Sequence, residues 1–193
     1  MEEVFLPKGT GGFISPEKVI AQLELKPGWQ VADFGCGHGY FTLPVAKFIG
    51  PEGKVFAVDV LLEALEAVRS RAQLENVVNV ETVRGNLELA SGSGLPDNSV
   101  DLVLLHNVLF QSQKKSDIIK EARRVLKNGG LFALVDWRPA STAGGAGQAV
   151  FGPQEGSRLA PEQAQELAQN EAFAFRRSFD AGQYHFGLMF LKA

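Results

Sequence analysis

The sequence predicts an α/β fold, a three-layer sandwich in which helices cover both faces of a mostly parallel β-sheet. Short apolar segments alternate along the chain with longer segments of helical periodicity, which is the pattern of a parallel sheet joined by helices. The short segments are almost continuously apolar, as expected for strands that are buried on both faces. Each element can be justified in chain order.

The first half of the chain is predicted to hold three helices, the first of them short, and three strands. Ser15-Pro16-Glu17 begins a helix through Leu23, because Ser is a favoured N-cap residue and Pro fits the first helical turn. Gly50-Pro51-Glu52-Gly53 ends the next helix. The remaining elements expected here are strands 30–34, 54–59 and 77–83 and helices 40–49 and 61–74.

The second half begins after a turn at Pro96-Asp97-Asn98-Ser99. Lys127-Asn128-Gly129-Gly130 places a basic residue and then glycines at the end of a helix, as is typical of a helix C-terminus. Residues 138–159, rich in Gly, Ala and Ser, are predicted to form a long loop that is either mobile or part of a site, and whether it is a lid stays open. The regular elements expected here are strands 100–105 and 131–136 and helices 116–126 and 160–169.

The last two apolar runs, 172–179 and 184–191, decide the topology. The connection Asp180-Ala181-Gly182-Gln183 is long enough for a hairpin but too short for a parallel crossover. One of these two strands is therefore expected to run against the rest. The sheet then has seven strands, mostly parallel, with an antiparallel last strand.

The composition indicates the class of protein. The 193 residues are expected to form one domain, 1–193, with residues 1–24 as an N-terminal helical cap segment. No membrane span is expected, because no apolar run approaches the about 20 residues that a span needs. The net charge of -3 disfavours nucleic acid as a partner. A single Cys36 and an acidic start of the chain predict a cytoplasmic protein without a zinc site, while a homodimer stays open.

A Gly-rich turn follows the first predicted strand. Gly35, Gly37 and Gly39 let the backbone approach a ligand closely and adopt positive φ values. Asp59 stands at the end of the next strand, where a carboxylate can accept hydrogen bonds from both hydroxyls of a ribose. These residues meet at the carboxyl edge of the sheet, where open α/β sheets bind their ligands.

The turn differs from the dinucleotide-binding fingerprint, because Tyr40 stands where the third Gly is required. Asp33, at the end of the strand, would repel a pyrophosphate but would suit a ligand with an ammonium or sulfonium charge. A nicotinamide oxidoreductase is therefore the weaker alternative. Asp33 has a second interpretation, as an N-cap of the helix that follows.

The order of these motifs resembles that of class I S-adenosylmethionine-dependent methyltransferases. Within that family the chain is most similar to the small-molecule group that includes ubiquinone and menaquinone biosynthesis methyltransferases. The resemblance covers about residues 13–191 and implies a Rossmann-like sheet. The segments that carry it are 31–42, 55–59, 84–87, 95–103 and 121–130.

The resemblance implies S-adenosylmethionine as the cofactor. It places Asp33 near the amino-acid end of the cofactor, Asp59 on the ribose and Asn86 on the adenine amino group. The family usually has Asp at position 86, and Asn keeps a carbonyl acceptor there, so we expect a modest loss of affinity. The residues implied to bind the cofactor are Asp33, Phe34, Gly35, Gly37, Gly39, Tyr40, Asp59, Val60, Asn86, Leu87 and His106.

The reaction implied is methyl transfer to an unidentified, small-molecule acceptor. In this chemistry the cofactor carries the reactivity, and the protein supplies orientation and desolvation. The candidates for a general base are His106, Asp136 and His185, and the sequence does not choose among them. The alternative is a catalytically silent S-adenosylmethionine-binding module that acts through a partner.

Overall fold

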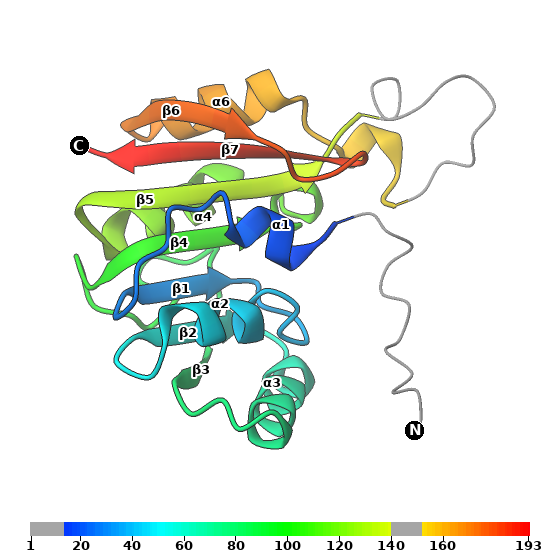
Figure 1. Ribbon diagram of the computed structural model, residues 1–193. Coiled ribbons are helices and arrows are strands. Elements are labelled where there is room, and N and C mark those ends of the chain that lie inside the picture. The colour runs from blue at the N-terminus through cyan, green and yellow to red at the C-terminus, as the bar shows by residue number, and fades with distance from the viewer. Residues whose placement is uncertain (1–13, 140–151) are drawn as a thin grey trace.

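The computed structural model describes residues 14–139 and 152–193. Within these ranges seven strands form one sheet, and helices pack on it (Figure 1). The strands are β1 (Gln30–Phe34), β2 (Lys54–Asp59), β3 (Val80–Arg84), β4 (Val100–His106), β5 (Leu126–Trp137), β6 (Phe173–Phe179) and β7 (His185–Lys192). The helices are α1 (Pro16–Ile20), α2 (Thr42–Ile49), α3 (Leu62–Leu74), α4 (Lys115–Val125) and α6 (Pro161–Asn170), with 3-10 turns η2 (Leu109–Gln111) and η3 (Glu155–Ser157).

The sheet has the strand order β3-β2-β1-β4-β5-β7-β6. Strands β1 to β5 run parallel to one another. Strand β7 is antiparallel to both of its neighbours, β5 and β6. The predicted fold, a mostly parallel seven-stranded sheet with an antiparallel last strand, is therefore confirmed.

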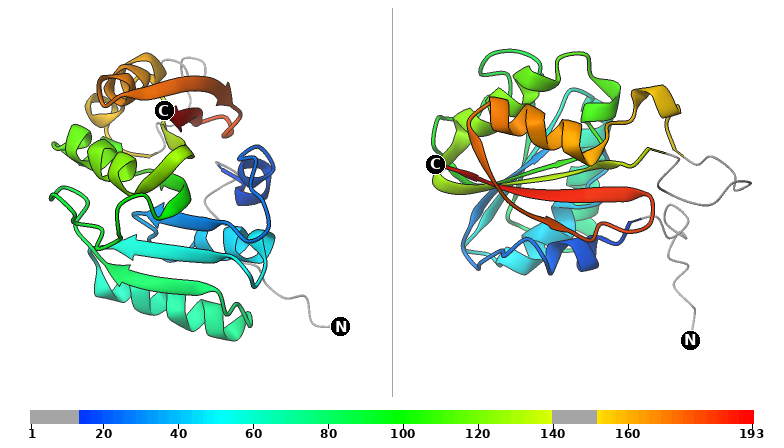
Figure 2. Two further views of the ribbon diagram at one scale, coloured as in Figure 1. Left: turned by 90° about the vertical axis from the view of Figure 1, so that its left-hand side faces the viewer. Right: turned by 90° about the horizontal axis from the view of Figure 1, so that it is seen from above.

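Two helix layers enclose the sheet, as the right-hand view of Figure 2 shows. On one face Val45 of α2 belongs to the same apolar core as Leu102 of β4. On the other face Ile118 of α4 and Ala164 of α6 share a core with Val103. Because Leu102 and Val103 are consecutive, β4 buries successive side chains on opposite faces, which explains its apolar run from Leu102 to Leu105.

Strand β3 begins at Val80, three residues later than the sequence predicts. Asn76 has a φ of 54°, and the N–H of Val77 bonds to the carbonyl of Ala72, so the end of α3 extends into this segment. The side chain of Asn79 donates to the carbonyl of Ala46 at 2.9 Å. The residues just before β3 therefore bond to the C-terminal ends of α3 and α2. Pairing with β2 begins only at Val80.

Strand β5 begins at Leu126, where a helix end followed by a turn was predicted. Leu126 pairs with Val100, and Leu131 pairs with Leu102, so the four residues between them form a bulge. Gly129 adopts a φ of 77° inside it. The bulge is invisible to the hydrophobic pattern because its residues are polar or Gly.

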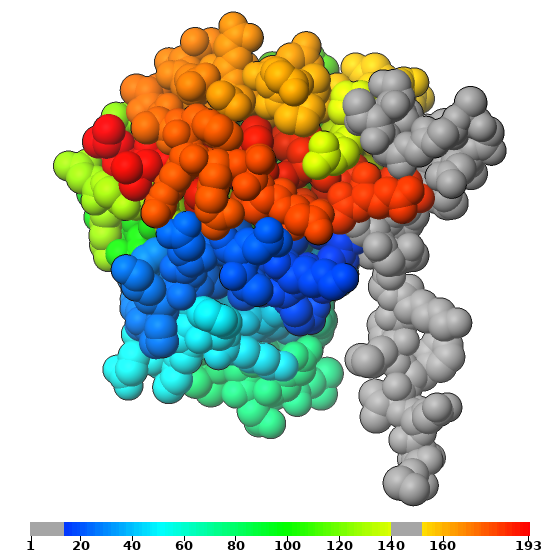
Figure 3. Space-filling view, turned by 45° about the horizontal axis from the view of Figure 1, so that its top comes forward, coloured from blue at the N-terminus to red at the C-terminus, as the bar shows by residue number. Residues whose placement is uncertain are grey.

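The segment after α1 lies against the end of the β6–β7 hairpin (Figure 3). Gln22 donates to the carbonyl of Asp180 at 2.8 Å and accepts from its N–H at 3.1 Å. Ser15 is the N-cap of α1, as predicted, but the helix ends at Ile20 rather than Leu23, because the next hydrogen bonds span three residues. The segment after α1 is thereby hydrogen-bonded to the link between β6 and β7.

Parts of two predicted segments lie outside the described residues, namely 1–13 of the N-terminal cap and 140–151 of the Gly-rich loop. Among the helices that are described, none has the length and apolar character needed to cross a bilayer.

Candidate functional site

A cavity of about 620 Å³ opens at the carboxyl ends of β1, β2 and β4. The chain leaves β1 toward one side of the sheet and β4 lies on the other, so this edge is a topological switch point, the usual ligand site of such sheets. The residues that line the cavity are Gly35, Gly37, Asp59, Val60, Leu61, Gly85, Asn86, Leu87, Glu88, His106, Asn107, Val108, Gln111, Ser112 and Ile118.

The Gly-rich turn forms one wall of the cavity. Gly35 has a φ of 71°, and a Cβ atom on it would lie 2.4 Å from a methyl group of Val108. Gly37 has a φ of 50°, and a Cβ atom on it would meet no described atom within 4 Å. Gly35 is therefore required by packing, whereas Gly37 presents bare backbone to the cavity.

The carboxylate of Asp59 is held in place by backbone N–H groups. The N–H of Gly37 donates to its Oδ2 at 2.9 Å, and the N–H of Leu61 donates to its Oδ1 at 3.0 Å. A carboxylate has about four acceptor positions, so capacity remains on both oxygens. Asp59 is thus fixed at the cavity wall with acceptors available for two hydroxyl groups.

Asp33 is buried behind the turn and does not line the cavity. The hydroxyl of Thr42 donates to its Oδ2 at 2.5 Å, and its Oδ1 has no partner within the described part of the chain. Burial raises the pKa of Asp33 to about 7; hydrogen bonds from Thr42 oppose this rise, and the charge of Asp59 adds to it. The N-cap residue of α2 is Phe41, so Asp33 is linked to the start of that helix through Thr42 instead.

His106 and Asn107 form the wall at the end of β4. The His106 ring lies 4.5 Å from that of Phe41, and burial, with the neighbouring His185, lowers the pKa of His106 to about 4. Asn107 adopts a φ of 55°, a conformation that Asn tolerates better than most residues. Among the described residues, Nδ1 of His106 and Oδ1 of Asn107 are buried without partners.

The other two candidate bases lie away from the cavity. Asp136 is buried and accepts backbone hydrogen bonds from Leu109 at 3.0 Å and Phe110 at 3.3 Å. Burial raises its pKa to about 6, although these bonds oppose the rise. His185 is buried, with its ring 4.2 Å from that of Trp137. Asp136 therefore secures the turn η2, and only His106 of the three candidates lines the cavity.

The loop after β3 forms the opposite wall. Oδ1 of Asn86 accepts from the N–H of Glu88 at 3.0 Å, and the hydroxyl of Ser112 donates to Oε1 of Glu88 at 2.6 Å. A Cβ atom on Gly92 would lie 1.8 Å from the carbonyl oxygen of Asn86, so the loop closes tightly on itself. The two sides of the cavity are thus joined through Glu88 and Ser112.

The structure brings together seven of the eleven residues that the sequence assigned to a cofactor. The other four lie outside the cavity lining. Asp33 is behind the turn, and Phe34 is in the core on the α4 side. Gly39 packs near Val68, and the Tyr40 hydroxyl donates to the carbonyl of Ile14 at 2.7 Å. The seven that line the cavity are Gly35, Gly37, Asp59, Val60, Asn86, Leu87 and His106.

Sequence reasoning did not assign the second half of the cavity wall to the site. Most of these residues follow β4, and the rule that ligands lie at the carboxyl ends of strands would have pointed to them. Glu88 gives no signal of this kind, since an acidic residue in a polar loop is ordinarily solvated. The unassigned residues are Leu61, Gly85, Glu88, Asn107, Val108, Gln111, Ser112 and Ile118.

Comparison with known proteins identifies the family. The sequence profile of the methyltransferase domain matches residues 25–172, which is more than half of the chain. The chain belongs to the methyltransferase domain family. Its resemblance to class I S-adenosylmethionine-dependent methyltransferases is confirmed, and S-adenosylmethionine is the cofactor of that class.

Individual relatives of this methyltransferase agree with that assignment. It is 30% identical over 118 residues to the demethylmenaquinone methyltransferase of Geobacillus stearothermophilus, an alignment that covers 61% of this chain and 49% of the relative. It is 33% identical over 121 residues to the enzyme of the same name from Listeria welshimeri, covering 62% and 50%. The chain thus spans about half the length of the curated relatives it matches.

A solved structure shares nearly the whole fold. The S-adenosylmethionine-dependent methyltransferase from Aquifex aeolicus superposes with a TM-score of 0.84 at 24% identity, covering 97% of this chain and 94% of the other. At that identity the similarity shows the common fold alone. The function of the present cavity has to be argued from its own residues.

Proposed function

We propose that this methyltransferase binds S-adenosylmethionine in the cavity beside the Gly-rich turn and transfers its methyl group to a small aromatic acceptor. The charge of the cavity carries the proposal. Asp59 and Glu88 line it, Asp33 lies behind it, and no Lys or Arg is among its described lining residues. Such a wall attracts a ligand with sulfonium and ammonium groups and repels a pyrophosphate.

The polar atoms without partners support the same ligand. Oδ1 of Asp33 and Oδ1 of Asn107 are buried acceptors, and a buried acceptor without a donor costs about 1–3 kcal/mol. The ammonium group of the cofactor is a donor with three N–H bonds. We therefore assign Asn107 to the ammonium group at the amino-acid end, and Asp59, fixed by Gly37 and Leu61, to the ribose. Asp33, behind the turn, attracts the ammonium group through its charge.

S-Adenosylmethionine, when bound, supplies a methyl group that an acceptor atom takes by in-line displacement, the sulfur retaining the electron pair of the broken bond. The chain contributes binding, orientation and exclusion of water. His106 is uncharged at neutral pH because its pKa is near 4, and a base of that strength removes protons inefficiently. We assign His106 to orientation, which suits an acceptor that is already anionic or soft.

The names of two relatives support a class of acceptor. Two proteins that are 30% and 33% identical over about three fifths of this chain are named demethylmenaquinone methyltransferases. This similarity supports a small aromatic molecule as the acceptor.

Turnover tests the proposed function. The purified chain is incubated with S-adenosylmethionine and a panel of hydroxylated aromatic compounds, and S-adenosylhomocysteine is quantified. We expect acceptor-dependent product from the natural sequence, whereas protein that binds the cofactor but gives no product with any member would contradict a transferase for this class.

The variant Asp59→Ala tests the proposed ribose site by binding, separately from turnover. It removes the proposed ribose acceptor, and we expect cofactor affinity to fall by about 1–3 kcal/mol, the scale for a hydrogen bond to a charged group. Calorimetric titration with S-adenosylhomocysteine measures the change. An unaltered dissociation constant in the folded variant would remove Asp59 from the site.

A further inference from the structure

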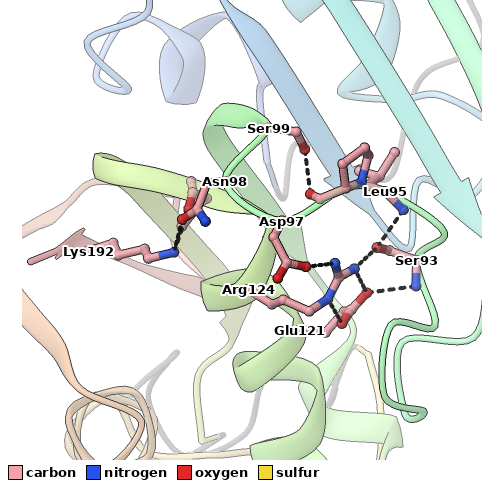
Figure 4. A network of polar contacts seen from close by, with 10 residues as sticks. Ser93, Leu95, Asp97, Asn98, Ser99, Glu121, Arg124 and Lys192 are labelled. Carbon is pink, nitrogen blue, oxygen red and sulfur yellow. Dashed lines mark hydrogen bonds and ion pairs between the residues drawn. The ribbon is translucent and has the colours of Figure 1, made fainter.

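The loop between β3 and β4 is held by side chains of α4 around Ser93, away from the loop residues that line the cavity (Figure 4). Glu121 of α4, buried, accepts from the N–H of Ser93 at 2.8 Å. Arg124 donates to both carboxylate oxygens of Glu121, at 2.7 and 2.8 Å, and contacts Asp97 at 2.5 Å. Three polar side chains, those of Glu121, Arg124 and Asp97, thereby fix the backbone of this loop.

The end of the loop at the cavity is equally constrained. The N–H of Asn86 donates to the carbonyl of Gly92 at 2.8 Å, and Gly92 permits the close approach of the two segments. Ser112, which is buried, ties Glu88 to the turn before α4 through its 2.6 Å hydrogen bond. Side chains of residues 86 and 88 therefore stand in the cavity wall in a defined position.

The hydrogen bonds leave these two side chains with complementary functions. Oδ1 of Asn86 already accepts from the N–H of Glu88, so the amide nitrogen of Asn86 is its available group, a donor. Oε1 of Glu88 accepts from Ser112, and Oε2 has no partner in the described part of the chain. The same cavity wall thus offers a donor from Asn86 and a charged acceptor from Glu88.

We propose that Glu88 determines specificity for the base of the cofactor. Its carboxylate accepts a hydrogen bond from the exocyclic amino group, while the amide of Asn86 donates to the adjacent ring nitrogen. A 6-aminopurine presents that donor and acceptor side by side, whereas a 6-oxopurine presents an acceptor and a ring N–H, the reverse order. The proposal rests on the function proposed above, and it explains how Asn is accommodated where the family usually has Asp.

Binding of two cofactor products tests the proposal. S-Adenosylhomocysteine and S-inosylhomocysteine differ in the amino and oxo groups, and each is titrated calorimetrically into the natural chain and into Glu88→Gln. We expect the natural chain to prefer the adenosyl compound by about 10- to 100-fold, the scale for a hydrogen bond to a charged group. The Gln amide can donate to the oxo group, so the preference of Glu88→Gln should fall to a few-fold at most.

Two further variants separate recognition from loop structure. Glu66→Gln makes the same change on the exposed side of α3 and should keep the full preference. Ser112→Ala removes the anchor of Glu88 but not its carboxylate, and should keep most of the preference. If Glu88→Gln weakens both ligands equally, or if Ser112→Ala abolishes the preference as fully as Glu88→Gln does, Glu88 only supports the loop and the proposal is overturned.

The same titrations distinguish failure of this proposal from failure of the proposed function. A natural chain that binds both compounds with equal affinity contradicts the role of Glu88 alone. A natural chain that binds neither compound contradicts the cofactor site itself, and the proposal for Glu88 with it.

Discussion

Asp33 is the buried carboxyl group that we propose attracts the ammonium end of the cofactor, so its protonation is expected to affect binding. Burial raises its pKa to about 7, so below that pH the free protein holds a proton there that an ammonium ligand must displace. We therefore expect the affinity for S-adenosylhomocysteine to increase between pH 5.5 and 7.5, by at most about tenfold per pH unit. Calorimetric titration across this range measures the slope. Asp33→Asn should bind more weakly and with a flatter dependence, and an unchanged slope in that variant would assign the effect to another group.

The raised pKa of Asp33 has the opposite consequence for stability. An acid whose folded pKa lies above its unfolded value of 3.8 stabilises the fold only while it is protonated. That contribution is complete below about pH 4 and is lost as the pH rises to about 7. The natural chain therefore keeps at neutral pH a carboxylate that costs stability, as is common for groups retained for binding.

A side chain added at Gly37 tests whether the Gly-rich turn is the binding site. Its Cβ position is clear of described atoms but faces the proposed ligand, and its φ is 50°. We expect Gly37→Val to fold with some loss of stability and to lose measurable affinity for S-adenosylhomocysteine. Gly28→Val is the matched control, because Gly28 also has a positive φ, 81°, and a clear Cβ position, outside the cavity. Equal affinity in the two variants would count against the turn as the binding site.

At the scale of elements, the contact between α4 and the loop after β3 depends on one buried ion pair. Arg124 contacts Glu121, whose side chain is only 2% exposed. Burial raises the pKa of Glu121, but hydrogen bonds from Arg124 and Ser93 outweigh that effect and hold the pKa below its usual value. Arg124→Ala would leave this carboxylate buried and unpaired, a loss of about 3–5 kcal/mol in the free energy of unfolding.

Urea unfolding measures that loss against a surface ion pair. Lys47 and Glu75 form such a pair, with side chains 55% and 34% exposed, so Lys47→Ala should cost less than about 1 kcal/mol. A group with a lowered folded pKa stabilises the fold above its unfolded pKa, here 4.5. The deficit of Arg124→Ala should therefore shrink as the pH falls below 4.5, and a similar, pH-independent cost in both variants would contradict the role of the pair.

The elements also show what the sequence predicts and what it leaves undetermined. The apolar pattern located the central strands β1, β4 and β5 because both of their faces are buried. The short link at 180–183 predicted the antiparallel strand. The predicted start of β3 was wrong because the Asn79 side chain donates hydrogen bonds to carbonyls at the C-terminal end of α2, a contact between residues distant in sequence. Local patterns contain no information about such contacts.

The candidate site likewise contains residues whose positions the sequence predicts and residues whose positions it does not predict. The places of Gly35, Gly37 and Asp59 at the cavity were predictable, because a strand–turn–helix motif leaves few other residue types suitable at those positions. The placement of Tyr40 was not, because its hydroxyl contacts Ile14, across a gap that only folding closes. Asp136 was a candidate base by its position after a strand, and only the three-dimensional contacts with η2 indicate its structural use.

At the scale of the whole molecule, strand order and charge act together. The switch point between β1 and β4 creates the cavity, and the connections that follow β2, β3 and β4 supply its walls. The lining residues include acidic side chains, and the described lining contains no basic ones. The strand order therefore positions the cavity, and under our proposal its negative charge favours a cationic nucleoside over a dinucleotide.

The central claim, that this cavity holds S-adenosylmethionine, is tested most directly by calorimetric titration of the purified chain with S-adenosylhomocysteine, and with NAD as the comparison. We predict binding of S-adenosylhomocysteine with a micromolar dissociation constant and no detectable binding of NAD. Binding of NAD without S-adenosylhomocysteine would show that the Gly-rich turn accepts a pyrophosphate. That result would contradict the assignment of the acidic cavity to a sulfonium cofactor.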